Sequence, residues 1–290
     1  MTRPSRYAVL RGLIAGYAAV WSAVRGPAVF DTFDFADRRF DPIGPLAFLD
    51  GPLPEVLVVV ATLVAPIAAA FLAFGKRERV SGPLAAICFL FVTTYRNSWG
   101  HLLHTENLVS LHLVVLAVAP FVRPSATATS ERANDREWAI DALAVLTVGT
   151  YFLAGVAKLR ISGSTWLDGD VLRHQIAFDN ARKEVLGDTA SPFAPWILRQ
   201  GWLLAPAAIM TVIVELGAPL ALLRGRIAVA WVGLAMAFHV AILAFMAILF
   251  PYQLLGIALA PLLPVERLGA TVSGWTGRFR RASPKSIPTG

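Results

Sequence analysis

The chain consists mainly of long apolar runs separated by short polar segments. The apolar positions are continuous and do not alternate every second residue, which predicts spanning helices and argues against a membrane β-barrel. The sequence therefore predicts an all-α, polytopic transmembrane helix bundle. About eight spans are expected, over residues 7–24, 55–74, 83–95, 103–122, 138–157, 203–223, 227–250 and 252–264.

Composition agrees with this class. Hydrophobic residues make up 56% of the 290 positions and charged residues 16%, and mean hydropathy is +0.61; a soluble domain has about 45–50% apolar and about 25% charged residues. The net charge of +7 lies mostly between and beyond the apolar runs. The positions of these charges therefore indicate how the chain is oriented in a membrane. The expected partner is the lipid bilayer and not nucleic acid. The single cysteine, Cys88, excludes an internal disulfide or CxxC redox pair.

Basic residues set the expected orientation, because short cytoplasmic segments of membrane proteins collect Lys and Arg. With the N-terminus inside, 16 of the 26 basic residues fall on the inner side. Both termini of this multi-pass cell-membrane protein are therefore expected in the cytoplasm. The expected organisation is a membrane domain, 1–268, with outer loops 25–54 and 159–202 and a polar inner loop 123–137, followed by a basic, disordered tail, 269–290.

Polar residues are the most informative positions in such a bundle, because an unpaired polar group is costly inside a bilayer. The fifth span runs into YFLAGVAKLR, so Lys158 is expected at the outer end of that span, followed by Trp166 and Asp168. The third and fourth spans meet at YRNSWGHLLHTEN, residues 95–107, at the same end. This segment contains Trp99, His101, His104 and Glu106.

Two further titratable residues, Glu215 and His239, fall near the middle of predicted spans, so each requires an internal partner or a water-filled cavity. An interior Arg or His, or protonation, would satisfy Glu215. Two interpretations of Lys158 stay open: a functional amine, or a side chain that snorkels to the headgroups from a helix end. His101 and His104 lack the HExxH pattern and a third ligand. A polar knot between helices is therefore favoured, and no metal is expected.

Several motifs resemble the HTTM membrane domain, the part of vitamin K-dependent gamma-carboxylase that holds its transmembrane helices. YFLAGVAKLR followed by WLDGD is similar to the family signature Y-F-x-A-G-x-x-K-L…W-x-x-G. VLRGLIAG, SWGHLLHTENL and AFHVAILAFMAILFPYQLLGIALAP resemble further family segments in the same order. The resemblance covers residues 7–264, and its collinearity carries more weight than any single motif.

The resemblance implies a role for each polar residue. Lys158 corresponds to the carboxylase lysine that acts as base at vitamin K hydroquinone, whose oxygenation yields a stronger base that deprotonates a glutamate side chain before carbon dioxide adds. A desolvated lysine suits this role, because it can hold a neutral amine near neutral pH. His104 or His101 would orient the substrate or shuttle a proton. The lipophilic molecule, a reduced quinone such as vitamin K hydroquinone, would be bound by His239, Trp99, Trp166, Asp168, Glu106 and Glu215.

Two departures limit what the resemblance implies. The carboxylase has an Asn-His pair at the start of its fourth span, where this chain has residues 104–107, HTEN, so the equivalent histidine is ambiguous. The carboxylase also carries a large luminal domain after its helices, for which residues 265–290 offer no counterpart. We therefore expect the small-molecule half of the site without the means to hold a protein glutamate.

Three functions stay open from the sequence. The first is an HTTM-like enzyme, carboxylase-like or a quinone-dependent lyase or oxidoreductase, with Lys158 as base. The second is a non-enzymatic or redox-partner module that acts with a separately encoded soluble or secreted protein, in the manner of a DoxX-type quinone protein or a component of export or immunity. The third is a structural membrane protein in which Lys158 only snorkels.

Overall fold

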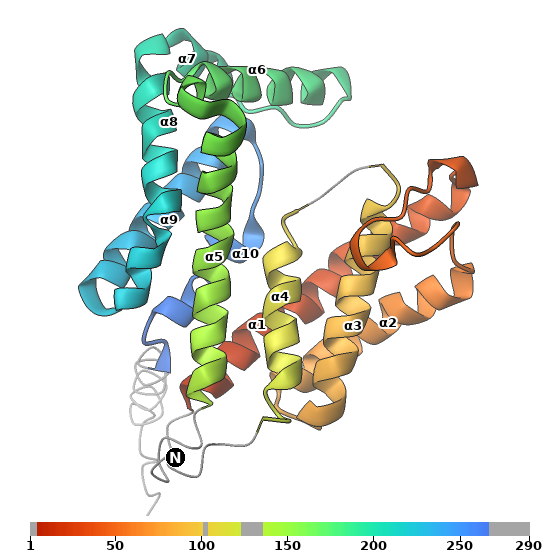
Figure 1. Ribbon diagram of the computed structural model, residues 1–290. Coiled ribbons are helices and arrows are strands. Elements are labelled where there is room, and N and C mark those ends of the chain that lie inside the picture. Colours follow the sequence, from red (N-terminus) through yellow and green to blue (C-terminus); the bar gives the residue numbers. More distant parts are fainter. Residues whose placement is uncertain (1–4, 101–103, 123–135, 267–290) are drawn as a thin grey trace, which may run out of the picture.

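The computed structural model describes residues 5–100, 104–122 and 136–266, and all regular structure in these ranges is helical (Figure 1). The α-helices are α1 (Arg6–Arg25), α2 (Glu55–Ala73), α3 (Glu78–Asn97), α4 (Asn107–Val118), α5 (Glu137–Ser162), α6 (Asp170–Val185), α7 (Ala194–Arg199), α8 (Gly201–Leu216), α9 (Gly225–Met246) and α10 (Pro251–Leu254). The 3-10 helices are η1 (Gly26–Asp34), η2 (Asp37–Arg39), η3 (Gly44–Leu46), η4 (Gly163–Trp166), η5 (Ala218–Leu223) and η6 (Ala260–Leu262).

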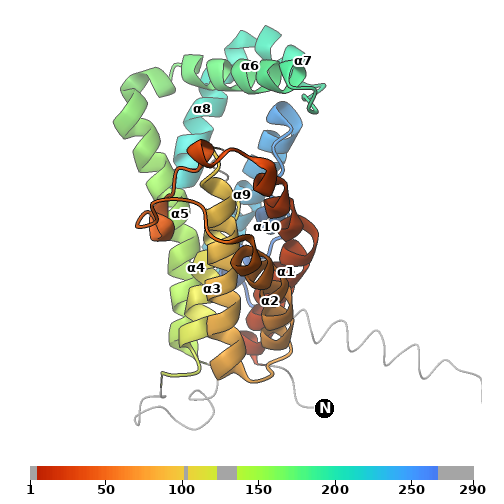
Figure 2. The same cartoon turned by 90° about the vertical axis from the view of Figure 1, so that its right-hand side faces the viewer.

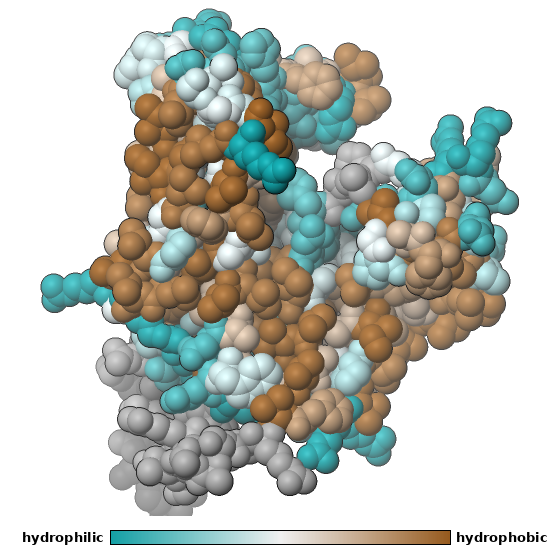
Figure 3. Space-filling model, viewed as in Figure 1, coloured by the Kyte–Doolittle hydropathy of each residue, from teal (hydrophilic) through white to brown (hydrophobic). Residues whose placement is uncertain are grey.

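Four helical segments are long and apolar enough to cross a membrane: Arg6–Asp34, Glu55–Ala73, Glu137–Trp166 and Gly225–Met246. Figure 3 shows the matching surface pattern, with hydrophobic residues over the middle of the molecule and hydrophilic residues gathered toward its two ends. Each of the first seven predicted spans overlaps a helix, but α4 and α8 are shorter apolar helices and α3 is not among these four segments. The all-helical prediction is thus confirmed, with four segments in the described chain both long and apolar enough to cross a membrane, while the count of about eight spans stays a prediction.

The predicted eighth span, 252–264, is wrong as a continuous helix. The chain forms the single turn of α10 and then further turns and η6. Gly256 has a φ of +72°, a left-handed conformation that interrupts a helix. Irregular backbone of this kind is tolerated within a bundle where protein groups satisfy it. Here Thr147 of α5 satisfies one of these backbone groups, because its hydroxyl donates a hydrogen bond to the Ala258 carbonyl at 2.8 Å.

A fully buried histidine of α4, His112, holds this irregular segment in place. Its Nδ1 lies 2.7 Å from the Tyr252 hydroxyl, and its Nε2 lies 3.2 Å from both the Leu143 carbonyl and the Thr147 hydroxyl. With the Tyr252 hydroxyl donating to Nδ1 and Nε2–H donating to Leu143, both ring nitrogens are satisfied. His112 is therefore a structural residue that ties α4 and α5 to the segment after α9.

The two ends of the described chain lie at the same end of the bundle (Figure 1). Arg6, at the start of α1, donates to the carbonyls of Pro261 and Leu263 at 2.8 and 2.9 Å. The first and last described residues thus lie on one side, while the position of the termini themselves and their cytoplasmic orientation stay predictions. The predicted disordered tail, 269–290, and nearly all of the predicted inner loop 123–137 lie outside the described residues.

At the opposite end, α6 lies crosswise over the bundle and contacts α8 and α9 (Figures 1 and 2). We call residues 163–200, which contain η4, α6 and α7, the covering segment. The helices α5, α8 and α9 below it share one hydrophobic cluster, whereas α1 to α4 share a larger one. The residues that carry the proposed chemistry come from α5, α8, α9 and the covering segment.

Candidate functional site

Lys158 lies within α5 and not at its end, because the helix continues to Ser162. The predicted fifth span, 138–157, lies within α5, which continues beyond it by about one turn. The Lys158 ammonium forms an ion pair with Oε1 of Glu215, near the end of α8. The side chains of Lys158 and Glu215 are 22% and 3% exposed. The amine thus points toward a neighbouring helix and not outward, which is not the geometry of a snorkelling lysine.

Gly155 allows α5 and α8 to approach closely enough for this pair. A Cβ at position 155 would lie 2.9 Å from Cβ of Glu215 and 3.0 Å from a side-chain carbon of Leu216. Carbon atoms pack best at about 3.5–4.0 Å, so only glycine fits without a shift of the helices. Gly155 lies three residues before Lys158 and therefore on the same face of α5. The Gly-x-x-Lys spacing brings Glu215 within reach of the amine.

A cavity of about 330 Å³ opens beside the ion pair, and we call it the lysine cavity. Its walls come from α5, α6, α7, α8, α9 and Trp166. Among its described lining residues Lys158 is the one charged group, and Gln175 and Thr211 are the uncharged polar ones. Small-molecule sites typically have volumes of about 300–1,000 Å³, mostly apolar walls and a few polar anchors. The lysine cavity has this form.

Two aromatic rings flank the amine at the cavity wall. The Lys158 ammonium lies 5.1 Å from the ring centre of Trp166 and 5.7 Å from that of Phe238. Trp166 is buried, and its indole N–H lies 3.3 Å from the Ala208 carbonyl and 3.2 Å from the Thr211 hydroxyl. The indole is thereby fixed against α8. Its face is available to a cation and to a flat ligand.

His239 lies beside this site and has a phenol as its partner. Its Nε2 lies 2.6 Å from the Tyr151 hydroxyl, while its Nδ1 is buried and unpaired among the described residues. Tyr151, Gly155 and Lys158 follow at intervals of four and three residues, so they share one face of α5. The sequence predicted that His239 has an internal partner, and the structure identifies this partner as Tyr151. Sequence reasoning had not assigned a role to Tyr151. The four- and three-residue spacing was the signal that could have found it.

The structure places His104 near His239 and not at the ion pair. The His104 ring lies 5.8 Å from the ring of Phe250, which in turn lies 5.0 Å from the ring of His239. His104 is exposed and does not line the lysine cavity. His101, the other candidate for a proton shuttle, lies outside the described residues.

The remaining predicted site residues lie elsewhere. Glu106 is buried and accepts a hydrogen bond from the indole of Trp21 of α1 at 3.2 Å. Trp99 packs against aromatic rings of the loop that follows α1. Asp168 is exposed in the turn before α6. The structure therefore groups Lys158 with Glu215 and Trp166, and it places Trp99 and Glu106 around the ends of α1, α3 and α4.

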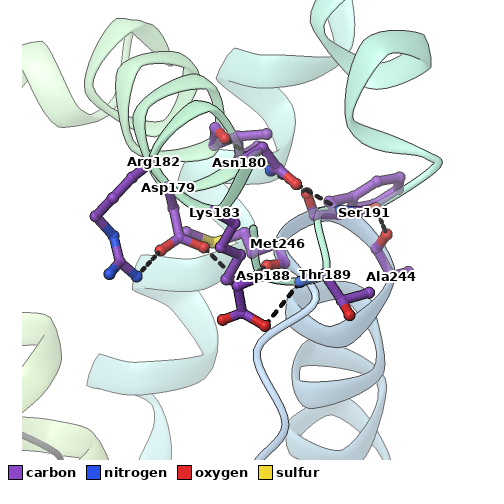
Figure 4. Close-up of polar contacts among 11 residues, drawn as sticks. Asp179, Asn180, Arg182, Lys183, Asp188, Thr189, Ser191, Ala244 and Met246 are labelled. Carbon is purple, nitrogen blue, oxygen red and sulfur yellow. Dashed lines mark hydrogen bonds and ion pairs between the residues drawn. The ribbon is translucent and has the colours of Figure 1, made fainter. Parts of the chain in front are cut away.

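The covering segment is fixed to the end of α9 by three polar side chains (Figure 4). The last carbonyls of a helix have no partner within the helix, and here three consecutive ones accept hydrogen bonds from the covering segment. The Lys183 ammonium donates to the Met246 carbonyl, and the Ser191 hydroxyl donates to the Ala244 carbonyl. The Asn180 amide donates to the Phe245 carbonyl at 3.0 Å. A lysine at this end also favours the helix dipole. The sequence pattern gave no signal for these contacts.

Replacing Asn180 by Leu should lower the free energy of unfolding by about 1–3 kcal/mol. The Asn180 amide donates to Phe245, and its oxygen accepts from the buried backbone N–H of Ser191 at 2.7 Å, so Leu would leave buried groups unpaired. SDS titration in detergent micelles measures the change. The control is Glu184→Leu, at an exposed position of the same helix outside the lysine cavity. Equal losses in both variants would contradict a capping role for Asn180.

Comparison with known proteins adds no family assignment to this description. No protein-family model, curated protein or solved structure matches the chain. Within residues 5–100, 104–122 and 136–266, no group of three or more His, Cys, Asp and Glu side chains is placed to hold a metal ion. The function is therefore argued from the geometry of the site.

Proposed function

We propose that the protein is a multi-pass protein of the cell membrane that binds a lipophilic small molecule in the lysine cavity. The observation that carries this proposal is the single Lys158–Glu215 pair at the wall of a cavity that is otherwise almost entirely apolar. Such a cavity suits a molecule with an apolar body and one or two polar atoms, which the amine would orient. Two of its apolar lining residues, Met210 of α8 and Leu234 of α9, are also exposed on the hydrophobic surface of the molecule.

A quinone or hydroquinone has this form, with a flat apolar ring and two oxygen atoms. Lys158 would donate to one oxygen, and the rings of Trp166 and Phe238 beside the amine would pack on the flat body. The resemblance to the HTTM domain points to the same class, a reduced quinone such as vitamin K hydroquinone. When bound, such a molecule would supply reducing equivalents to a carboxylase-like, lyase or oxidoreductase reaction.

Glu215 explains how Lys158 would act as a base. The amine must first lose its proton, and the carboxylate in contact with it can accept that proton, because an isolated ion pair is costly in apolar surroundings. Oε2 of Glu215 is buried and has no hydrogen-bond partner among the described residues, so it offers a place for the proton. The neutral Nζ of Lys158 would then accept a proton from a ligand hydroxyl.

Filling the lysine cavity tests the proposal. Ala241 of α9 lines the cavity, so Ala241→Phe should reduce the amount of bound lipophilic molecule by about tenfold or more, equivalent to at least about 1.4 kcal/mol of binding free energy. Mass spectrometry of lipophilic molecules that copurify with the protein, and titration with menaquinone, measure this. The control is Ala230→Phe, at an exposed position of the same helix. Equal occupancy in the two variants would overturn the proposal.

One observation favours the second candidate, a module that acts with a separate soluble or secreted protein. The covering segment exposes large apolar side chains, among them Phe178, Val185 and Leu186, which are 71%, 85% and 68% exposed. Exposed apolar patches of this kind often mark interaction sites. A module that works only through such a partner would be unaffected by Ala241→Phe, whereas a cavity enzyme would lose activity.

A further inference from the structure

A second cavity, of about 460 Å³, lies between the end of η1, residues 52–55 and the end of α3, and we call it the aromatic cavity. Six of its lining residues decide its chemistry: Phe33, Phe35, Tyr95, Trp99, Asp37 and Glu55. Among the lining residues that the structure describes, none is Lys, Arg or His. The aromatic cavity is thus aromatic and acidic, whereas the lysine cavity is apolar with one cationic group.

The rings stand at steep angles to one another. Phe35 and Tyr95 lie with their ring centres 5.9 and 6.1 Å from that of Trp99, each at an interplanar angle of 68°. Phe40 packs against Tyr95 and Trp99, at 5.3 and 5.1 Å, and holds both in place. Rings set at such angles form adjacent walls of a cage and not a stack, so several aromatic surfaces border one space.

The charge around this cavity is the reverse of that of the whole chain. Residues 26–55 contain six acidic and two basic residues, in a protein of net charge +7. Two of the acidic residues, Asp37 and Glu55, line the cavity and are exposed. The guanidinium of Arg39 lies 5.6 Å from the ring centre of Phe35, so one of these rings already accepts a cation from the chain itself.

We propose that the aromatic cavity binds an alkylammonium group, above all a quaternary ammonium such as that of choline. A quaternary ammonium has no N–H to donate and is held by ring faces, with nearby carboxylates balancing its charge. A metal ion would instead need several oxygen ligands around one point, and the two carboxylates do not supply them. This proposal is independent of the function proposed for the lysine cavity. It assigns Trp99 to a cation-binding site and not to a quinone site.

Isothermal titration of the full chain in detergent micelles tests the proposal with choline and with its neutral isostere, 3,3-dimethylbutan-1-ol. Choline should bind about tenfold more tightly or better, because the two differ in charge and hardly in shape. Phe35→Leu and Asp37→Asn should each weaken choline binding about fivefold or more. The control is Asp34→Asn, an exposed neighbour outside the cavity lining, which should leave it unchanged. Absence of choline binding, equal binding of the two compounds, or equal effects of Asp34→Asn and Asp37→Asn would overturn the proposal.

The same titration in nanodiscs distinguishes the source of the ammonium group. Choline should bind to the protein in phosphatidylglycerol nanodiscs, which contain no quaternary ammonium. Loss of that binding in phosphatidylcholine nanodiscs would support the cavity as a lipid-headgroup site, and unchanged affinity would support it as a site for a soluble amine. Size-exclusion chromatography verifies the fold of each variant. A well-folded wild-type protein without choline binding in either nanodisc would overturn the proposal.

Discussion

Replacing Glu215 by Leu should lower the free energy of unfolding by about 3–5 kcal/mol, because the Lys158 ammonium then lies inside the bundle without its counter-charge. Lys158→Met should cost less, since the remaining carboxyl can take up a proton and become neutral. The double variant Lys158→Met/Glu215→Leu should recover most of the loss, because apolar side chains of similar size replace both charges. SDS titration in detergent micelles measures all three variants.

An exposed ion pair of the same chain provides the control. Arg224 and Asp141 also form an ion pair, but their side chains are 44% and 61% exposed. Asp141→Asn should therefore change stability by no more than about 1 kcal/mol. A double variant at positions 158 and 215 as unstable as Glu215→Leu would show that the lost pair is not the cause of the instability.

The double variant also separates chemistry from folding. A lysine that acts as base cannot be replaced by Met, so a stable Lys158→Met/Glu215→Leu protein should lose any hydroquinone-dependent activity completely. The single Lys158→Met variant is less informative, because it leaves Glu215 buried and unpaired. Activity retained in the stable double variant would contradict the proposed role of Lys158 and leave ligand binding in the lysine cavity as a separate question.

Gly169→Ala should lower the free energy of unfolding by about 2–5 kcal/mol. Gly169 has a φ of +83°, and a Cβ there would lie 2.5 Å from the backbone nitrogen of Ala205 and 2.6 Å from the backbone carbon of Leu204. Backbone atoms of α8 cannot rotate away as a flexible side chain can, so the covering segment would have to move off α8. Thermal unfolding in detergent micelles measures the loss.

Gly187→Ala is the matched control for this substitution. Gly187 also has a left-handed φ, +71°, but a Cβ there would meet open space. The cost should therefore be only that of the backbone conformation, about 1–2 kcal/mol. If both variants lose the same stability, close approach to α8 is not what Gly169 provides. A larger loss for Gly169→Ala would show that the glycine of the WLDGD motif is required by close packing against α8 in addition to its left-handed backbone.

The helices were largely predictable from the sequence, because the length of an apolar run is a local property. The prediction of an eighth span as a continuous helix was wrong for two reasons. One is local, because Gly256 has a left-handed conformation. The other is not local, because Thr147 and His112 of other helices hold the irregular segment in place. The ion pair of Lys158 was not predictable locally, because its partner Glu215 lies 57 residues further along the chain. No window of sequence around Lys158 contains that information.

The candidate site was only partly predictable from the sequence: its titratable residues could be found, but not the partners of these residues. The need of Glu215 and His239 for internal partners followed from their depth in apolar runs, but the partners, Lys158 and Tyr151, depend on how α5 packs against α8 and α9. The aromatic neighbours of Trp99 were not predictable, because the loop after α1 folds into 3-10 turns without a periodic pattern. The grouping of Trp99 with Phe35 therefore appears only in three dimensions.

The hydrogen bonds from Lys183, Asn180 and Ser191 to the end of α9 have a consequence for how the molecule opens. The carbonyls of residues 244–246 keep these partners as long as the covering segment stays in place, and the covering segment cannot leave without exposing them. We therefore expect the last turn of α9 and the covering segment to open as one cooperative unit, with amide protons that exchange with solvent together. On the side of the covering segment, access to the lysine cavity would then depend on the opening of this whole unit and not on the movement of single side chains.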